Sequence, residues 1–252
     1  MTARPSTIRR GLLATVVAVA LIAAACGSDD DTSPTPAAAA EPAAEQGDQT
    51  SASPVATAAV EPAADPRHEA SASSAAVELR QDMRKLWEDH VTWTRQFIVS
   101  AIAELPDTDA AAGRLLQNQA DIGAAIATFY GGEAGSHLTE LLRGHILVAA
   151  DLVAAAKVGD TAALEQQQAD WDANAVEIAE FLAAANPAWP VDTLIDMMRE
   201  HLDGTVAEAV ARLDGDWEAD IAAYDRVHTH ILLMADALTA GIIQQFPQQF
   251  DS

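Results

Sequence analysis

Three histidines recur at almost equal intervals along this sequence of 252 residues. His90, His145 and His201 are separated by 145 − 90 = 55 and 201 − 145 = 56 positions. Leucine or methionine stands four positions before each, which is on the same face of a helix if these segments are helical. We therefore expect the three side chains to point into a protein interior, where neutral imidazole can bind zinc, copper or iron.

A carboxylate and a further imidazole follow near the C-terminus. Asp225 and His228 are three residues apart, the spacing by which helical bundles take a carboxylate and a histidine ligand from one helix. One hypothesis is that these two residues and the three recurring histidines line one polar cavity that holds a divalent transition-metal ion. The candidate metal ligands are His90, His145, His201, Asp225 and His228.

A purely structural role for the histidines is the alternative. The helices expected opposite them carry polar residues, and a buried polar group needs a hydrogen-bond partner. The candidate partners are Asn118, Asp121, Asn174, Glu177 and His230. Repetition favours this alternative, because a structural device is copied with each repeat whereas one metal site needs only one set of ligands. General acid–base catalysis by the same cluster is a third hypothesis.

Other catalytic signatures are absent from the sequence. The glycine-rich residues 131–135 lack the lysine of a phosphate-binding loop, and the pattern Gly-x-Ser-x-Gly does not occur. The zinc-protease pattern His-Glu-x-x-His is also missing, and no cysteine follows Cys26. The sequence therefore leans against an enzyme.

The histidine spacing belongs to a longer internal repeat. Residues 141–182 match residues 197–238 at a constant offset of 201 − 145 = 56, and Gly159-Asp160 falls on Gly215-Asp216. A more diverged copy begins near residue 86, with one residue gained at its turn. A repeat of this kind is typical of supersecondary units that bury their apolar faces on one another. We expect three two-helix hairpins.

The helices that must position these residues are predicted from apolar spacing at i, i+3, i+4 and i+7 and from Gly, Pro and Asp at the turns. They cover approximately residues 75–105, 110–127, 135–158, 161–185, 190–213 and 216–245. Short links make neighbouring helices antiparallel. The predicted fold class is all-α, a six-helix antiparallel bundle of three repeated hairpins over residues 75–252, with the tryptophans supplying bulk in its core.

The N-terminal segment is predicted to be a targeting signal. Residues 1–25 have a basic start and an apolar run that is shorter than the about 20 residues of a membrane span. Residues 21–28 resemble the lipobox of bacterial lipoproteins. That resemblance implies lipidation of Cys26, with acyl chains such as palmitate, and an anchor on the outer side of the cell membrane. A secretory signal cut beside a stray cysteine is the alternative.

Residues 26–74 are predicted to be a disordered tether. They consist almost entirely of Ala, Pro, Ser, Thr and acidic residues. Such a segment buries too little apolar surface to offset the entropy of ordering its backbone. We expect it to space the folded part away from the membrane.

The charge of the chain excludes some partners. The formal net charge is −24, from 14 Lys and Arg against 38 Asp and Glu. Phosphate backbones and anionic lipid surfaces repel such a protein, so neither nucleic acid nor charge-driven lipid adhesion is expected. The negative net charge is consistent with cation binding or simply with solubility.

The folded part also resembles a wider group. Residues 86–95, 118–123 and 228–250 are similar to a group of small bacterial helical proteins whose activity is uncharacterised. The resemblance implies a helical fold and carries no activity.

Together these patterns predict a membrane-anchored extracytoplasmic lipoprotein whose helical bundle binds a metal ion or small ligand at the inward His/Asp cluster. The alternative is a structural or interaction lipoprotein that contacts other proteins of the cell envelope.

Overall fold

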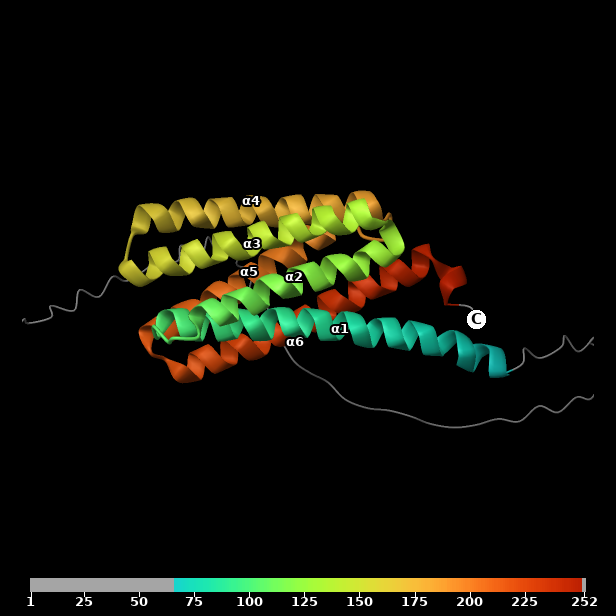
Figure 1. Cartoon of the computed structure of the whole chain (residues 1–252), viewed down its shortest axis with the longest axis horizontal. Coiled ribbons are helices and arrows are strands. Elements are labelled where there is room, and N and C mark those ends of the chain that lie inside the picture. Colours follow the sequence, from blue (N-terminus) through green and yellow to red (C-terminus); the bar gives the residue numbers. More distant parts are fainter. Residues whose placement is uncertain (1–65, 251–252) are drawn as a thin grey trace, which may run out of the picture. The chain divides into compact units, whose positions relative to one another are not determined.

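The computed structural model describes residues 66–250, with side chains from residue 74 onward. The predicted signal peptide, Cys26 and most of the predicted tether lie outside this part. Within it the chain forms six α-helices, a short 3-10 helix and no strand (Figure 1), which confirms the all-α class. The elements are α1 Pro66–Ile102, α2 Thr108–Tyr130, α3 Gly132–Val158, α4 Thr161–Ala185, α5 Val191–Asp214, α6 Trp217–Gln245 and η1 Pro247–Gln249.

Helix α1 begins at Pro66 rather than near residue 75. Proline suits the first turn of a helix because its missing N–H has no partner there and its φ is already helical. The residues that follow include several alanines, which favour helix. The sequence prediction failed here because these residues lack the large apolar side chains that mark a buried helical face.

Two of the turns share one local structure. Gly159 and Gly215 end α3 and α5 in the left-handed region, at φ 70° and 73°, where glycine has no steric penalty. Asp160 and Asp216 then accept a hydrogen bond from the amide three residues on, at 3.1 and 3.0 Å, and so cap α4 and α6. The turn after α1 instead places a non-glycine residue, Glu104, at φ 55°.

The helices close into a ring. Each packs against the next, and α6 returns to lie beside α1 (Figure 1). Arg80 and Arg84 on α1 both bind Asp236 on α6. Helix α1 also contacts α3 and α5. Close approach of α2 and α3 depends on glycine, because a Cβ on Gly123 would lie 2.5 Å from the Gly135 carbonyl oxygen.

The tryptophans divide between the core and the surface. Trp87, Trp171 and Trp189 are buried, as predicted. The prediction is wrong for Trp217, which is 56% exposed and stacks under the Arg212 guanidinium, 4.6 Å from its ring centre. Trp217 is the first residue of α6, directly after the turn that follows α5.

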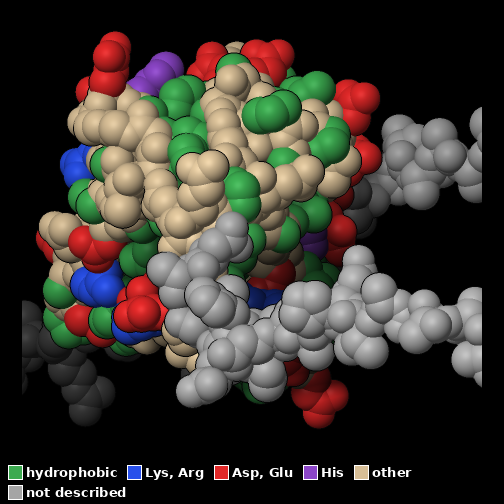
Figure 2. Space-filling model, turned by 90° about the vertical axis from the view of Figure 1, so that its right-hand side faces the viewer, with side chains coloured by type: hydrophobic (Ala, Val, Ile, Leu, Met, Phe, Trp, Pro, Cys, Tyr) green, Lys and Arg blue, Asp and Glu red, His purple; other side chains and the backbone are tan. Residues whose placement is uncertain are grey.

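Acidic side chains lie around the edge of the end face shown in Figure 2, with few Lys and Arg among them. None of the helices between residues 66 and 250 is both long and apolar enough to span a membrane.

Candidate functional site

The three recurring histidines come together inside the bundle. His90 on α1, His145 on α3 and His201 on α5 are 2 to 3% exposed. The ring centres of His90 and His201 are 5.5 Å apart, and those of His145 and His201 are 6.3 Å apart. We call these three side chains the imidazole cluster.

Polar side chains on the even-numbered helices hold each histidine-bearing helix in register. Asn118 on α2 donates to the Leu86 carbonyl at 2.9 Å, and Asn174 on α4 donates to the Leu141 carbonyl at 3.2 Å. On α6, a ring nitrogen of His230 lies 2.8 Å from the Met197 carbonyl oxygen. The acceptors are Leu86, Leu141 and Met197, each four residues before a cluster histidine.

The hydrogen bonds of Asn174 fix the tautomer of His145. The Asn174 amide nitrogen donates to a carbonyl, so its Oδ1 is the acceptor that faces His145 Nδ1 at 2.8 Å. His145 Nδ1 therefore carries the proton, and Nε2 keeps a bare lone pair. That Nε2 is buried and has no hydrogen-bond partner in the part of the chain that the structure describes.

The other two cluster histidines also lack good hydrogen-bond partners for a ring nitrogen. His201 Nδ1 is buried without a hydrogen-bond partner among residues 74–250. His90 Nδ1 lies 3.4 Å from the Gln119 amide nitrogen, a long contact because that nitrogen also donates to the Leu115 carbonyl at 2.8 Å. The Gln119 Oε1 has no partner within the same range.

Burial keeps the cluster neutral. It lowers the pKa of His90 to about 3, with a further contribution from His145, and it lowers the pKa of His145 to about 4. The pKa of His201 lies well below its ordinary value because of burial and the neighbouring imidazoles. At neutral pH each ring therefore retains a lone pair, which is the form that binds a metal ion.

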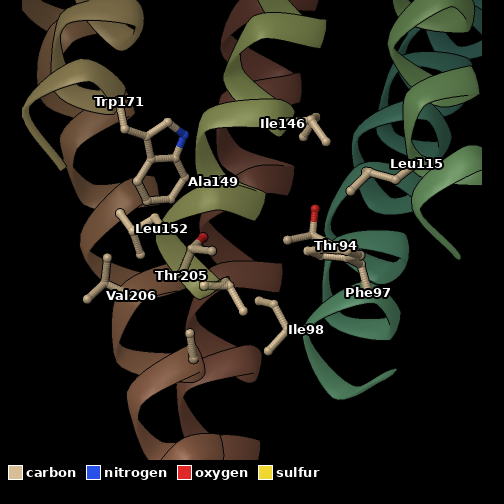
Figure 3. Close-up of a pocket in the computed structure, with 12 residues that line it drawn as sticks. Thr94, Phe97, Ile98, Leu115, Ile146, Ala149, Leu152, Trp171, Thr205 and Val206 are labelled. Carbon is tan, nitrogen blue, oxygen red and sulfur yellow. The ribbon is translucent and has the colours of Figure 1, made fainter. Parts of the chain in front are cut away.

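Aromatic rings cover the cluster. The Trp87 ring meets His90 edge-on at 5.8 Å, and the Trp171 ring lies 5.1 Å from His145. These indoles separate the imidazoles from water. One turn further along the bundle is a small apolar cavity of about 30 Å³, whose lining includes Thr94, Trp171 and Thr205 (Figure 3).

Two of the predicted ligands do not join the cluster. His228 is half-exposed, with its Nε2 3.0 Å from Glu88 Oε1, and Asp225 is exposed. Of the five residues predicted to line one cavity, three therefore lie together. The buried face of α6 passes through His230, and at about 100° per residue His228 lies about 200° around the helix.

Only some of the residues predicted to be hydrogen-bond partners of the histidines contact them. Asn174 bonds to His145, whereas Asn118 bonds to main chain and its neighbour Gln119 contacts His90 instead. Asp121 pairs with Gln117 and Arg114, and Glu177 is exposed, so neither acts as a partner of the cluster.

The rings do not yet enclose a metal position. No group of three or more His, Cys, Asp or Glu side chains between residues 74 and 250 is placed to hold a metal ion. In a tetrahedral site with metal–nitrogen bonds of about 2.0 Å, bound imidazole centres are about 5 Å apart. The observed 5.5 and 6.3 Å would have to shorten by about 0.5 Å and about 1.3 Å respectively.

A buried ionic network lies two turns from the cluster and was missed by sequence reasoning. Arg95 on α1 bonds to Glu208 at 2.7 Å and to Asp220 at 2.8 Å, and Arg212 bonds to Asp220 at 3.2 Å. Burial raises the pKa of Glu208 to about 7, although the Arg95 bonds oppose the shift. The available signal was spacing, since Glu208 follows His201 by seven residues on one helical face.

No protein family, curated protein or solved structure that was compared with the chain matches it. The resemblance of residues 86–95 to small bacterial helical proteins stays a prediction. Any function must therefore be inferred from the side chains themselves.

Proposed function

We propose that this protein is a lipid-anchored extracytoplasmic binding protein that holds one transition-metal ion at the imidazole cluster. The observation that carries the proposal is the pair of buried ring nitrogens, His145 Nε2 and His201 Nδ1, that have no hydrogen-bond partner within residues 74–250. An unsatisfied buried polar atom costs about 1–3 kcal/mol. A bound ion would give a partner to His145 Nε2, and to His201 Nδ1 in the tautomer that carries its proton on Nε2, and would recover that cost.

The placement of the ligands supports the proposal. Each imidazole comes from a different helix, α1 contacts both α3 and α5, and the His201 ring lies beside the rings of His90 and His145. Facing helices are where bundles build metal sites.

The three-hairpin repeat is part of the same proposal. The hydrogen bonds that reach Leu86, Leu141 and Met197 from the following helices occupy matching positions. Three copies of one hairpin, each with an inward histidine, would place three imidazoles near the shared axis. Repetition of the hairpin would then account for the cluster.

The anchor rests on the sequence around Cys26. A lipidated Cys26 and the tether that follows would place the bundle outside the cell membrane. Replacing Cys26 with Ser is expected to release the protein into the medium, whereas Ser28→Ala should leave it in the membrane fraction. Unchanged membrane retention of the Cys26→Ser variant would refute lipidation.

A structural or interaction role is the second candidate. The 2.8 Å bond between His145 and Asn174 favours it, because this pair fixes the register of α3 and α4 without a ligand. In that case the acidic surface would contact other envelope proteins, and the histidines would serve only the fold.

Metal analysis separates the two candidates. The purified full chain is stripped with EDTA, exposed in turn to zinc, copper and iron, and desalted, and its metal content is measured. One ion per chain is expected for the wild type and for His228→Ala, which alters only a half-exposed histidine. His201→Ala should lose the ion while keeping its helical circular dichroism. No stoichiometric metal in the wild type would overturn the proposal.

A further inference from the structure

The first turns of α6 carry large apolar side chains on their outer side. Trp217, Ile221 and Tyr224 follow one another at intervals of four and three residues, so they lie on one face of the helix. Trp217 is 56% exposed and Ile221 is 55% exposed. Tyr224 is half-buried beside α1, where its hydroxyl lies 3.3 Å from Thr92 Oγ1. We call these three side chains the α6 face; neighbouring apolar side chains left in water are typical of interaction sites.

The buried ionic network holds both aromatic rings of the α6 face. The Arg212 guanidinium lies 4.6 Å from the Trp217 ring centre, and that of Arg95 lies 4.8 Å from the Tyr224 ring centre. Both arginines are fixed by the buried carboxylate of Asp220. An aromatic side chain that is already held in one orientation loses little conformational entropy when a partner binds, and rigid aromatic residues are frequent anchors of protein interfaces.

Stability alone does not account for this network. Replacing a buried ion pair by apolar residues of similar volume is often neutral or stabilising. Two acids and two arginines are nevertheless placed between α1, α5 and α6. Positioning the exposed rings gives these buried charges a role that apolar residues could not fill.

The charges around the α6 face restrict its partner. Arg95 and Arg212 are bonded to buried acids, so their positive charge is neutralised. Exposed acids stand at the start of α6 and within its first turns: Asp214, Asp216, Glu218 and Asp225. A second copy of the chain, with its own formal net charge of −24, would be repelled, as would nucleic acid or an anionic lipid surface.

We propose that the α6 face binds a cationic segment of another protein. An apolar side chain of that segment packs on Trp217 and Ile221, and Lys or Arg residues on either side of it face the exposed acids. Opposite charge speeds the encounter and selects against acidic partners, whereas the apolar contact supplies affinity. The α6 face is separate from the imidazole cluster, so the proposal does not depend on metal binding.

Synthetic peptides test the proposal. A fluorescently labelled amphipathic helical peptide of Lys and Leu is titrated with the metal-stripped full chain, and binding is followed by fluorescence anisotropy. A peptide with Ser in place of every Leu measures attraction by charge alone, and one with Glu in place of every Lys reverses the charge. The Lys/Leu peptide should bind at least about tenfold more tightly than either of the others. Equal affinity for the Lys/Leu peptide and either control peptide would overturn the proposal.

Two exposed positions on α6 provide a matched pair of variants. Ile221 and Leu233 are 55% and 58% exposed. They are 233 − 221 = 12 residues apart, which places Leu233 about 18 Å further along the helix and about 120° around it. Trp217→Ala and Ile221→Ala should each weaken binding of the Lys/Leu peptide at least about fivefold, whereas Leu233→Ala should leave it unchanged.

The same loss of affinity in the Ile221→Ala and Leu233→Ala variants would contradict a specific α6 face. Circular dichroism checks that each variant keeps its helices, which is expected because all three substitutions shorten exposed side chains. Because the titrations use metal-stripped protein, failure here leaves the proposed metal function standing, and failure of metal binding leaves the α6 face standing.

Discussion

The buried neutral histidines predict that the metal-free protein loses stability in mild acid. A histidine in the unfolded chain takes up a proton near its ordinary pKa of 6.5, whereas the folded-state pKa of His90 is about 3 and that of His145 about 4. Below pH 6.5 the unfolded state therefore binds more protons than the folded state. Stability from these groups is fully present above pH 6.5 and falls as the pH falls toward the folded pKa values.

The size of the loss in unfolding free energy follows from the shifts in the histidine pKa values. Between pH 7.5 and 5.5, a histidine that stays neutral only in the folded state costs about 1.3 kcal/mol of unfolding free energy. His90 and His145 together give about 2.7 kcal/mol, and His201 adds to the loss because its pKa shifts in the same direction. Typical domains have only about 5–15 kcal/mol in total.

Urea unfolding followed by circular dichroism, in EDTA at each pH, measures this loss. The Glu208→Gln background is used because the Glu208 carboxyl titrates in the same window with the opposite sign. In that background His90→Leu should reduce the pH-dependent loss by about 1.3 kcal/mol, whereas His228→Leu, at a half-exposed position, should not. A free energy that changes by less than about 1 kcal/mol between pH 7.5 and 5.5 would refute the reasoning.

Further predictions concern the ionic network and the close helix contacts. Because the folded-state pKa of Glu208 is raised to about 7, this carboxyl contributes stability that falls as the pH rises from 4.5 to 7. Glu208→Gln should remove that dependence, by at most about 3 kcal/mol, in urea unfolding at several pH values. Gly241→Ala should lower the melting temperature by several degrees, since its Cβ would overlap the Trp189 ring. Gly113→Ala, with open space around it, should raise the melting temperature slightly, and equal melting temperatures for the two variants would contradict this packing.

The helix bounds were largely predictable because they depend on local signals. Gly159 and Gly215 end helices and Asp160 and Asp216 begin them, as the spacing of apolar residues and turn residues indicated. The start of α1 was not predictable in this way. Its first turns contain alanine and polar residues, which give no periodic apolar signal even where they are helical.

The candidate site was predictable only in part. The inward histidines followed from apolar neighbours one turn away, which report the buried face of each helix. The spacing of Asp225 and His228 places them on one face of α6, but spacing does not say which face of the helix is buried. The buried face is the one that carries His230. The sequence made no prediction for Gln119 and Glu208, because a charged or amide side chain is usually exposed and their partners lie far away in sequence.

The pairing of α1 with α6 has a consequence for the synthesis of the chain. Arg80 and Arg84 reach Asp236 across more than 150 positions, so α1 leaves the ribosome long before its partner exists. During that interval the nascent chain exposes an uncovered apolar seam that invites aggregation or chaperone binding. A product truncated before residue 217 would keep the seam open permanently, and quality-control proteases would remove it.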